Sequence, residues 1–222
     1  MRRHLILVPT EMERRGLAAI LAPATVQGCQ MALCGFGPVA AAARTAQLLA
    51  EHAPERVLLV GIAGRIDERL TVGEAYRFER VACYGVGAGS GAGFVRAEML
   101  GWQQWPGHAD DHVDGHAHGS NADPIGDVIT CGGEGAGLLV TACAASADAA
   151  DVRLRTEAFP AAAAEDMEGF AVALACRLRG VAIDIVRGIS NTAGDRDKAR
   201  WQISPAVEAA GRLALQIMAE AP

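Results

Sequence analysis

Short apolar runs alternate with helical patterns along the first sixty residues of the chain. An apolar run over Leu5–Val8 predicts a strand, and Thr10 with Glu13 forms the Thr-x-x-Glu pattern typical of a helix start. A second apolar run, Met31–Cys34, precedes an Ala-rich helical pattern over residues 38–51 that opens with proline. The pattern therefore predicts two successive strand–helix units.

The middle of the chain predicts further strands. After its first residue, Arg56–Val60 is entirely apolar, which is typical of a strand buried on both faces, and we expect it to end at the glycine-rich segment Gly61–Gly64. Strand-like runs follow near Glu74–Cys83, Val128–Thr130 and Leu138–Thr141.

The last third of the chain predicts a helix, a strand and a helix. Apolar residues recur at helical spacing in the first of these, namely Met167, Phe170, Ala171, Leu174 and Leu178. Gly180 is suited to close that helix, and Ala182–Val186 predicts the next strand. Ser204 and Pro205 supply an N-cap and a first-turn proline for a final helix reaching about Glu220.

Alternating strands and helices with apolar strands indicate an α/β fold. We expect a single-domain, three-layer architecture with a mixed, largely parallel central sheet flanked by helices. The length of 222 residues fits one domain spanning residues 1–222. Residues 85–127 are rich in Gly, His and Asp and show little periodicity, so we expect a loop or insertion there.

Composition narrows the class of partner. The chain has 20 basic and 26 acidic residues and is 51% hydrophobic, which argues against nucleic acid or an anionic membrane as partner and favours a small molecule. The apolar run near the amino end is too short for a secretory signal. All six cysteines lie in apolar surroundings without a CxxC pair, as expected of buried thiols in a cytoplasmic protein.

The segment Gly35–Ala40 follows a predicted strand and opens a helix. Its Gly-x-Gly-x-x-Ala spacing is that of dinucleotide-binding turns, so an NAD-dependent oxidoreductase is one alternative. That fingerprint also requires an acid at the tip of the next strand, where this chain has only Gly61–Gly64. A turn for tight packing, or one lining a smaller ligand site, is favoured instead.

A cluster of potential metal ligands offers a second alternative. His108, His112, His116, His118 and the aspartates between them could hold zinc or nickel and make the chain a metal-binding module. His108, His112 and His116 would share one face only in a helix, which the surrounding glycines and the lack of an apolar face disfavour. The pattern favours a solvated loop.

Three further segments place polar groups at strand ends or in the loops that follow, where α/β sheets bind ligands: residues 9–13, 165–169 and 187–196. Each key residue also has a structural interpretation. Glu13 fits a capping box with Thr10, Glu168 complements a helix dipole, and Asn191 is a common turn former.

Taken together, these segments resemble the purine nucleoside phosphorylase and nucleosidase superfamily, in particular its hydrolytic branch. The resemblance runs from Glu13 through GFGPVAA and VLLVGIAG to AEDMEGFAVALAC and VRGISNTAGDRD, and omits the His-rich loop. DMEGFAVA, and RGISNTAGDRD followed by Trp201, are most similar to the futalosine hydrolase family. The resemblance implies cleavage of the N-ribosidic bond of futalosine to hypoxanthine and dehypoxanthinyl futalosine, a step of menaquinone biosynthesis.

The resemblance also implies roles for particular residues. Glu13 would polarise the attacking water, Glu168 would hold the ribose hydroxyls, Met167 would pack on the sugar and Asn191 would face the base. Further substrate contacts are expected from Gly37, Ala63, Gly64, Asp166, Arg187 and Ser190. No cofactor and no metal are implied, and the chain is expected to form a homodimer or a larger homo-oligomer.

Two related activities stay open at this stage: a methylthioadenosine/S-adenosylhomocysteine-type nucleosidase and a purine nucleoside phosphorylase. Phosphorolysis needs an anion site, for which the available arginines are Arg14, Arg15, Arg65 and Arg187. Glu13 favours water, because a phosphate dianion beside it would meet like charge. The segment 143–146 lacks the aromatic residue that the family often places against the purine, and we expect Phe94, Trp102 or Trp105 to supply it.

Overall fold

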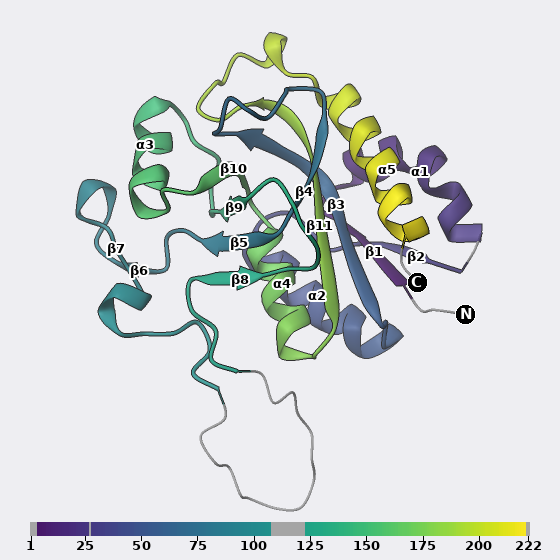
Figure 1. Ribbon diagram of the computed structural model, residues 1–222, viewed down its shortest axis with the longest axis horizontal. Helices are drawn as coiled ribbons and strands as arrows, with labels where there is room; N and C mark the ends of the chain where they lie inside the picture. Colours follow the sequence, from purple (N-terminus) through teal and green to yellow (C-terminus); the bar gives the residue numbers. More distant parts are fainter. Residues whose placement is uncertain (1–3, 27, 108–122, 221–222) are drawn as a thin grey trace, which may run out of the picture.

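The computed structural model describes residues 4–26, 28–107 and 123–220, and its elements surround one central sheet (Figure 1). The helices are α1 (Glu11–Val26), α2 (Pro38–His52), α3 (Ala149–Ala158), α4 (Gly169–Leu178) and α5 (Ile203–Glu220). The sheet contains β1 (His4–Val8), β2 (Gln30–Leu33), β3 (Arg56–Arg65), β4 (Ala75–Phe78), β5 (Arg80–Cys83), β8 (Val128–Thr130), β9 (Leu138–Thr141), β10 (Ala162–Asp166) and β11 (Ala182–Thr192). None of the described helices is long and apolar enough to cross a membrane.

The long strand β3 organises the sheet. It runs parallel to β1 along its first half and parallel to β11 along its other edge. At its carboxyl end it leaves β1 and pairs antiparallel with β10, where Gly64 lies opposite Glu165. Beyond β10 the sheet continues through β9 and β5, both parallel, to the antiparallel β8. The predicted mixed, largely parallel sheet is confirmed.

Helices cover both faces of this sheet. Leu5 and Leu7 of β1 pack in the core that contains residues of α2 and α4, and Ile6 and Val8 pack in the core with residues of α1 and α5. Side chains of successive strand residues point to opposite faces, so an unbroken apolar run supplies both cores at once. Flanking helices on a central sheet give the predicted three layers (Figure 1).

Two strands extend further than their sequence predicts. β3 continues through the expected turn at Gly61–Gly64, and β11 continues six residues beyond Val186 to Thr192. The two extensions pair with each other, since Gly61 to Arg65 lie opposite Arg187 to Thr192. The interpretation of Asn191 as a turn residue is therefore wrong.

Other elements differ from the prediction in smaller ways. The run Glu74–Cys83 is two strands, and α3 and β10 were not predicted. The helix expected to include Met167 begins at Gly169, so Met167 lies outside it. Ser204 lies inside α5 and is not its N-cap.

The segment 85–127 has more structure than a loop in its described parts. It contains a hairpin of β6 (Gly87–Ala88) and β7 (Val95–Arg96), followed by a short 3-10 turn. Buried Asp127 anchors this segment by accepting a hydrogen bond from the Glu98 backbone N–H at 3.2 Å. The four histidines proposed as metal ligands lie outside the described residues.

Candidate active site

A cavity of about 520 Å³ opens where the carboxyl ends of β1, β3, β10 and β11 meet. Its volume lies in the range of small-molecule sites, which is roughly 300–1,000 Å³. Of the ten predicted site residues, the following line the cavity: Glu13, Ala63, Gly64, Asp166, Met167, Glu168, Ser190 and Asn191. The remaining two, Gly37 and Arg187, lie behind the lining and contact Glu168.

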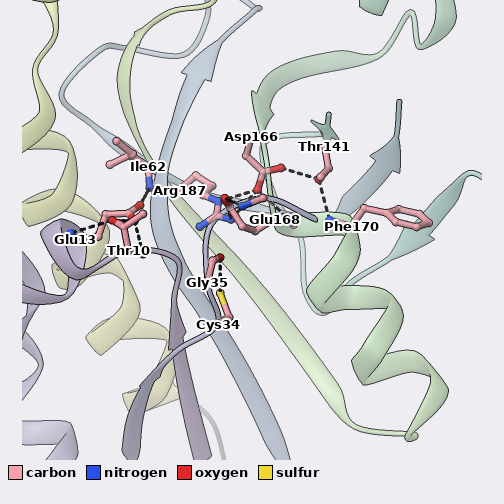
Figure 2. Close-up of polar contacts among 12 residues, drawn as sticks. Thr10, Glu13, Cys34, Gly35, Ile62, Thr141, Asp166, Glu168, Phe170 and Arg187 are labelled. Carbon is pink, nitrogen blue, oxygen red and sulfur yellow. Dashed lines mark hydrogen bonds and ion pairs between the residues drawn. The ribbon is translucent and has the colours of Figure 1, made fainter. Parts of the chain in front are cut away.

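Glu13 is held by hydrogen bonds on both of its carboxylate oxygens (Figure 2). Oε2 accepts from the Thr10 backbone N–H at 3.0 Å and from the Thr10 hydroxyl at 2.5 Å. Oε1 accepts from the Ile62 backbone N–H of β3 at 2.9 Å. The predicted capping pair with Thr10 therefore exists, but the bond to Ile62 fixes the carboxylate against the cavity as well.

Glu168 occupies the N-cap position of α4 without capping that helix. Its Oε1 instead accepts from the Gly37 backbone N–H at 2.9 Å, which joins it to the start of α2. Gly37 has φ of +81°, a conformation that glycine adopts readily. The glycine turn that resembles a dinucleotide site is thus already engaged by a carboxylate of this chain, which would repel a pyrophosphate and disfavours the NAD alternative.

Asp166 provides the anchor behind Glu168. Its Oδ1 accepts from the Thr141 hydroxyl at 2.6 Å, and its Oδ2 accepts from the Gly169 backbone N–H at 2.8 Å and from the Arg187 guanidinium. These bonds occupy much of the carboxylate and tie α4 to β9 and β11 (Figure 2). Although Asp166 lines the cavity, its contacts favour a positioning role over direct contact with a ligand.

The Arg187 guanidinium lies fully buried between the two glutamates. Its Nη2 is 2.6 Å from Asp166 and 3.6 Å from Glu168, while its Nη1 has no hydrogen-bond partner among the described residues. A Cβ placed on Gly61 would come too close to this Nη1 and to Oε1 of Glu13 unless these side-chain ends shifted. Glycine at position 61 therefore leaves room for both charged groups beside β3.

Burial is the main influence on the ionisation of Glu168. Desolvation raises the pKa of its carboxyl from the ordinary 4.5 to about 7, although the Arg187 guanidinium opposes this rise. A carboxyl with that pKa changes its charge in the physiological range, and only its ionised form is purely an acceptor of hydrogen bonds.

We expect Glu168→Gln to abolish most activity and to stabilise the protein at neutral pH. A raised folded-state pKa means that folding favours the protonated acid, so the free energy of unfolding of the wild type falls between pH 4.5 and about 7. Glutamine does not ionise and so avoids this loss of stability. The free energy of unfolding of the variant should exceed that of the wild type by an amount that grows over this pH window to about 1–3 kcal/mol and then levels off. Melting temperatures of both proteins at several pH values test this, and an advantage independent of pH would contradict it.

Asn191 and Ser190 form a linked pair at the end of β11. The Ser190 hydroxyl donates to Oδ1 of Asn191 at 2.8 Å, and Nδ2 of Asn191 donates to the Thr192 carbonyl at 2.8 Å. An amide has two N–H donors and two acceptor lone pairs, so one donor and one lone pair stay available for a ligand. The backbone pairing of β11 with β3 shifts register here, between Ile189 and Asn191.

The segment after β9, residues 143–146, forms a wall of the cavity. Glu165 of β10 holds it by accepting from both the backbone N–H and the hydroxyl of Ser146, at 2.8 and 2.6 Å. Arg155 of α3 pairs with Glu165 at 3.1 Å and donates to the Ala144 carbonyl at 2.7 Å. This buried ion pair shapes a wall that consists mostly of small side chains and backbone.

Several expectations about the surroundings of the site are wrong. The aromatic side chains in the cavity are Phe36 and Trp201; Phe94, Trp102 and Trp105 are absent from its lining. Cys143 is exposed and lines the cavity, so it is not a buried thiol, and all six cysteines are free.

The arginines considered for phosphate do not line the cavity either. Arg14 and Arg15 pair with Glu11 on the surface, and Arg65 donates to Thr192 and to the Leu70 carbonyl. Arg187 is enclosed by carboxylates. The arginine that does line the cavity is Arg196, which motif reasoning did not single out.

The family model described as the phosphorylase superfamily matches residues 10–220, which is most of the chain. This chain belongs to that superfamily. Two curated relatives within it, both named futalosine hydrolase, are 30% identical: one from Streptomyces coelicolor over 92% of this chain and 85% of its own length, and one from Thermus thermophilus over 97% and 95%.

A solved structure shows the same fold. The 5′-methylthioadenosine/S-adenosylhomocysteine nucleosidase of Neisseria meningitidis, in complex with methylthio-immucillin-A, matches with a TM-score of 0.73 over 99% of this chain and all of its own. Its sequence identity is 20%, so the similarity supports the fold but does not identify the substrate of this chain.

Proposed function

We propose that this chain hydrolyses the N-ribosidic bond of futalosine, releasing hypoxanthine and dehypoxanthinyl futalosine for menaquinone biosynthesis. One observation carries the proposal: the buried carboxylates of Glu13 and Glu168 line the same cavity of nucleoside size, with the buried Arg187 guanidinium behind them. The two futalosine hydrolases that align over most of this chain support the same substrate.

Glu13 is suited to hold the attacking water, because its carboxylate lines the cavity. The Arg187 guanidinium is buried behind the lining, where its positive charge stabilises the carboxylates beside it. A water in the cavity would donate a hydrogen bond to the Glu13 carboxylate and keep a lone pair for C1′. As the water attacks, its proton passes to Glu13, and the electron pair of the C1′–N9 bond leaves with the purine.

Glu168 would stabilise the sugar as that bond breaks. Loss of the base gives C1′ and the ring oxygen oxocarbenium-like positive charge, and hydrogen bonds from the ribose hydroxyls to an anion strengthen as this charge develops. The Gly37 backbone bond holds one oxygen of Glu168, so the carboxylate is already oriented before the substrate binds. Met167, the preceding residue, also lines the cavity and is suited to pack on the sugar.

A methylthioadenosine/S-adenosylhomocysteine nucleosidase is the second candidate, because a solved structure with that name shares the fold. The two activities require the same water and ribose contacts and differ at the base. An amide at position 191 pairs with a 6-oxopurine and, unlike a carboxylic acid, supplies no proton to N7. This difference favours futalosine.

The decisive experiment incubates purified protein with futalosine, inosine or methylthioadenosine, each with and without phosphate, and identifies the released base and sugar. We expect hypoxanthine and a free reducing sugar from futalosine, at a rate independent of phosphate. Release of a sugar 1-phosphate would establish phosphorolysis, and adenine from methylthioadenosine with no reaction of futalosine would establish the second candidate.

A further inference from the structure

Arg196 is the one basic side chain that lines the cavity in the described part of the chain. Four acidic residues line the same cavity, at positions 13, 165, 166 and 168. Arg196 is exposed, and among the described residues its guanidinium forms neither an ion pair nor a hydrogen bond. Arg200, on the same loop, instead pairs with Asp195 at 2.9 Å and with Asp197 at 3.4 Å.

The position of Arg196 is defined by its neighbours. Its guanidinium carbon lies 5.3 Å from the centre of the Trp201 ring, in the geometry of a cation–π contact, and Trp201 also lines the cavity. The indole N–H of Trp201 donates to the Asp195 carbonyl at 3.0 Å. The backbone N–H of Gln202 donates to the Ser190 carbonyl at 2.7 Å, which ties the end of this loop to β11 beside Asn191.

An unpaired guanidinium in an otherwise acidic cavity is suited to an anionic group on the ligand. This inference rests on the proposed function, in which the base faces Asn191 and the ribose hydroxyls face Glu168. Neither the 6-oxopurine nor the ribose carries charge. An anionic group on the nucleoside would therefore have to be attached at C5′. We infer that Arg196, stacked on Trp201, binds a carboxylate on the C5′ substituent and selects substrates that carry one.

Free phosphate is the other anion that a guanidinium fork binds well. A phosphate acting as nucleophile would have to reach C1′, where Glu13 and Glu168 lie, whereas Arg196 belongs to the loop between β11 and α5. The carboxylate of the substrate itself is therefore the expected partner. Rates measured with and without phosphate separate the two sources.

The test compares a carboxylate with its neutral form. Futalosine, whose C5′ chain ends in a benzoate, and its methyl ester form a matched pair, and inosine lacks the chain. We expect Arg196→Gln to lower kcat/KM for futalosine by roughly 10- to 100-fold, mainly through KM, because a charge-assisted hydrogen bond is lost. Cleavage of the ester and of inosine should change by less than about twofold, and Arg196→Lys should restore part of the preference.

Arg200→Gln is the matched control, since it removes the same charge from the same loop at a residue outside the cavity lining. It should leave the acid-to-ester ratio of kcat/KM unchanged. Equal cleavage of acid and ester by the wild type, or an equal loss of both in Arg196→Gln, would overturn the inference. A phosphate-dependent rate that Arg196→Gln abolishes would also overturn it and assign Arg196 to phosphate.

A different result would contradict the proposed function and not the role of Arg196: futalosine and its ester would both stay intact while an adenine nucleoside is cleaved. In that case S-adenosylhomocysteine, which carries a carboxylate on its C5′ chain, and its methyl ester replace the first pair. The same comparison of Arg196→Gln with Arg200→Gln then decides whether Arg196 binds the carboxylate.

Discussion

Glu13→Gln is expected to lower kcat by roughly 100- to 10,000-fold, the usual contribution of a positioned general base. The substitution keeps the shape of the side chain but removes the group that accepts a proton from water. The Thr10 and Ile62 backbone N–H groups donate to different oxygens of Glu13, and glutamine offers only one oxygen. One N–H would face an amide NH2, so we also expect a loss of stability of about 1–3 kcal/mol.

That loss of stability must be separated from the loss of chemistry. Turnover is therefore measured at a temperature where circular dichroism shows the variant to be fully folded. Glu11→Gln is the matched control, because Glu11 belongs to the same first turn of α1 and pairs with Arg14 and Arg15 on the surface. It should keep wild-type turnover. If folded Glu13→Gln turned over at a similar rate to Glu11→Gln, Glu13 would be a capping residue alone.

The sequence pattern predicted two kinds of element: helices with an apolar face, and strands whose apolar side chains pack on both faces of the sheet. β1, β2 and the start of β3 carry unbroken apolar runs, and α2 starts at the predicted proline. In contrast, β10 reads Ala-Ala-Ala-Glu-Asp, and neither alanine nor an acid favours a strand. Its strand conformation comes from pairing with β9 and β3, which no local pattern shows.

Helix α3 was not predicted, although its sequence contains an N-cap residue. Asp148 accepts hydrogen bonds from the backbone N–H groups of residues 150 and 151, as an N-cap does. The helix that follows lacks a strong apolar stripe, because its one buried residue is Arg155, which pairs with Glu165. The sequence alone does not distinguish a buried arginine from an exposed one, because the distinction depends on an acidic partner elsewhere in the fold.

The candidate site was predictable as a set of residues but not as a network. The motifs around positions 13, 168 and 191 do meet at one cavity. The bond between Gly37 and Glu168 joins residues 131 positions apart, and Glu13 and Arg187 come together beside Gly61 only in the folded chain. Arg196 looked like one of several charges in a polar loop, and only the cavity distinguishes it from Arg200.

The base specificity is expected to depend on Asn191. Ser190 and Thr192 each take one hydrogen-bonding position of its amide, which leaves one N–H and one lone pair for the ligand. The N–H can donate to O6 or N7 of hypoxanthine, and the carbonyl oxygen can accept from N1–H. In the same pose, adenine would place an amino group against the amide N–H and a bare N1 against the amide oxygen, and the bonds to Ser190 and Thr192 oppose the flip of the amide that would match it. Such a mismatch can lower kcat/KM by several powers of ten.

Asn191→Asp should shift this preference toward 6-amino substrates. A protonated aspartic acid can deliver its proton to N7 of adenine as the bond breaks, which an amide cannot do. The measurement is the ratio of kcat/KM for futalosine to that for its 6-amino analogue, with methylthioadenosine as a third substrate. Wild-type protein that cleaves the 6-amino substrates as well as futalosine would show that Asn191 does not read the purine, and the selection of substrate would then rest on the C5′ substituent.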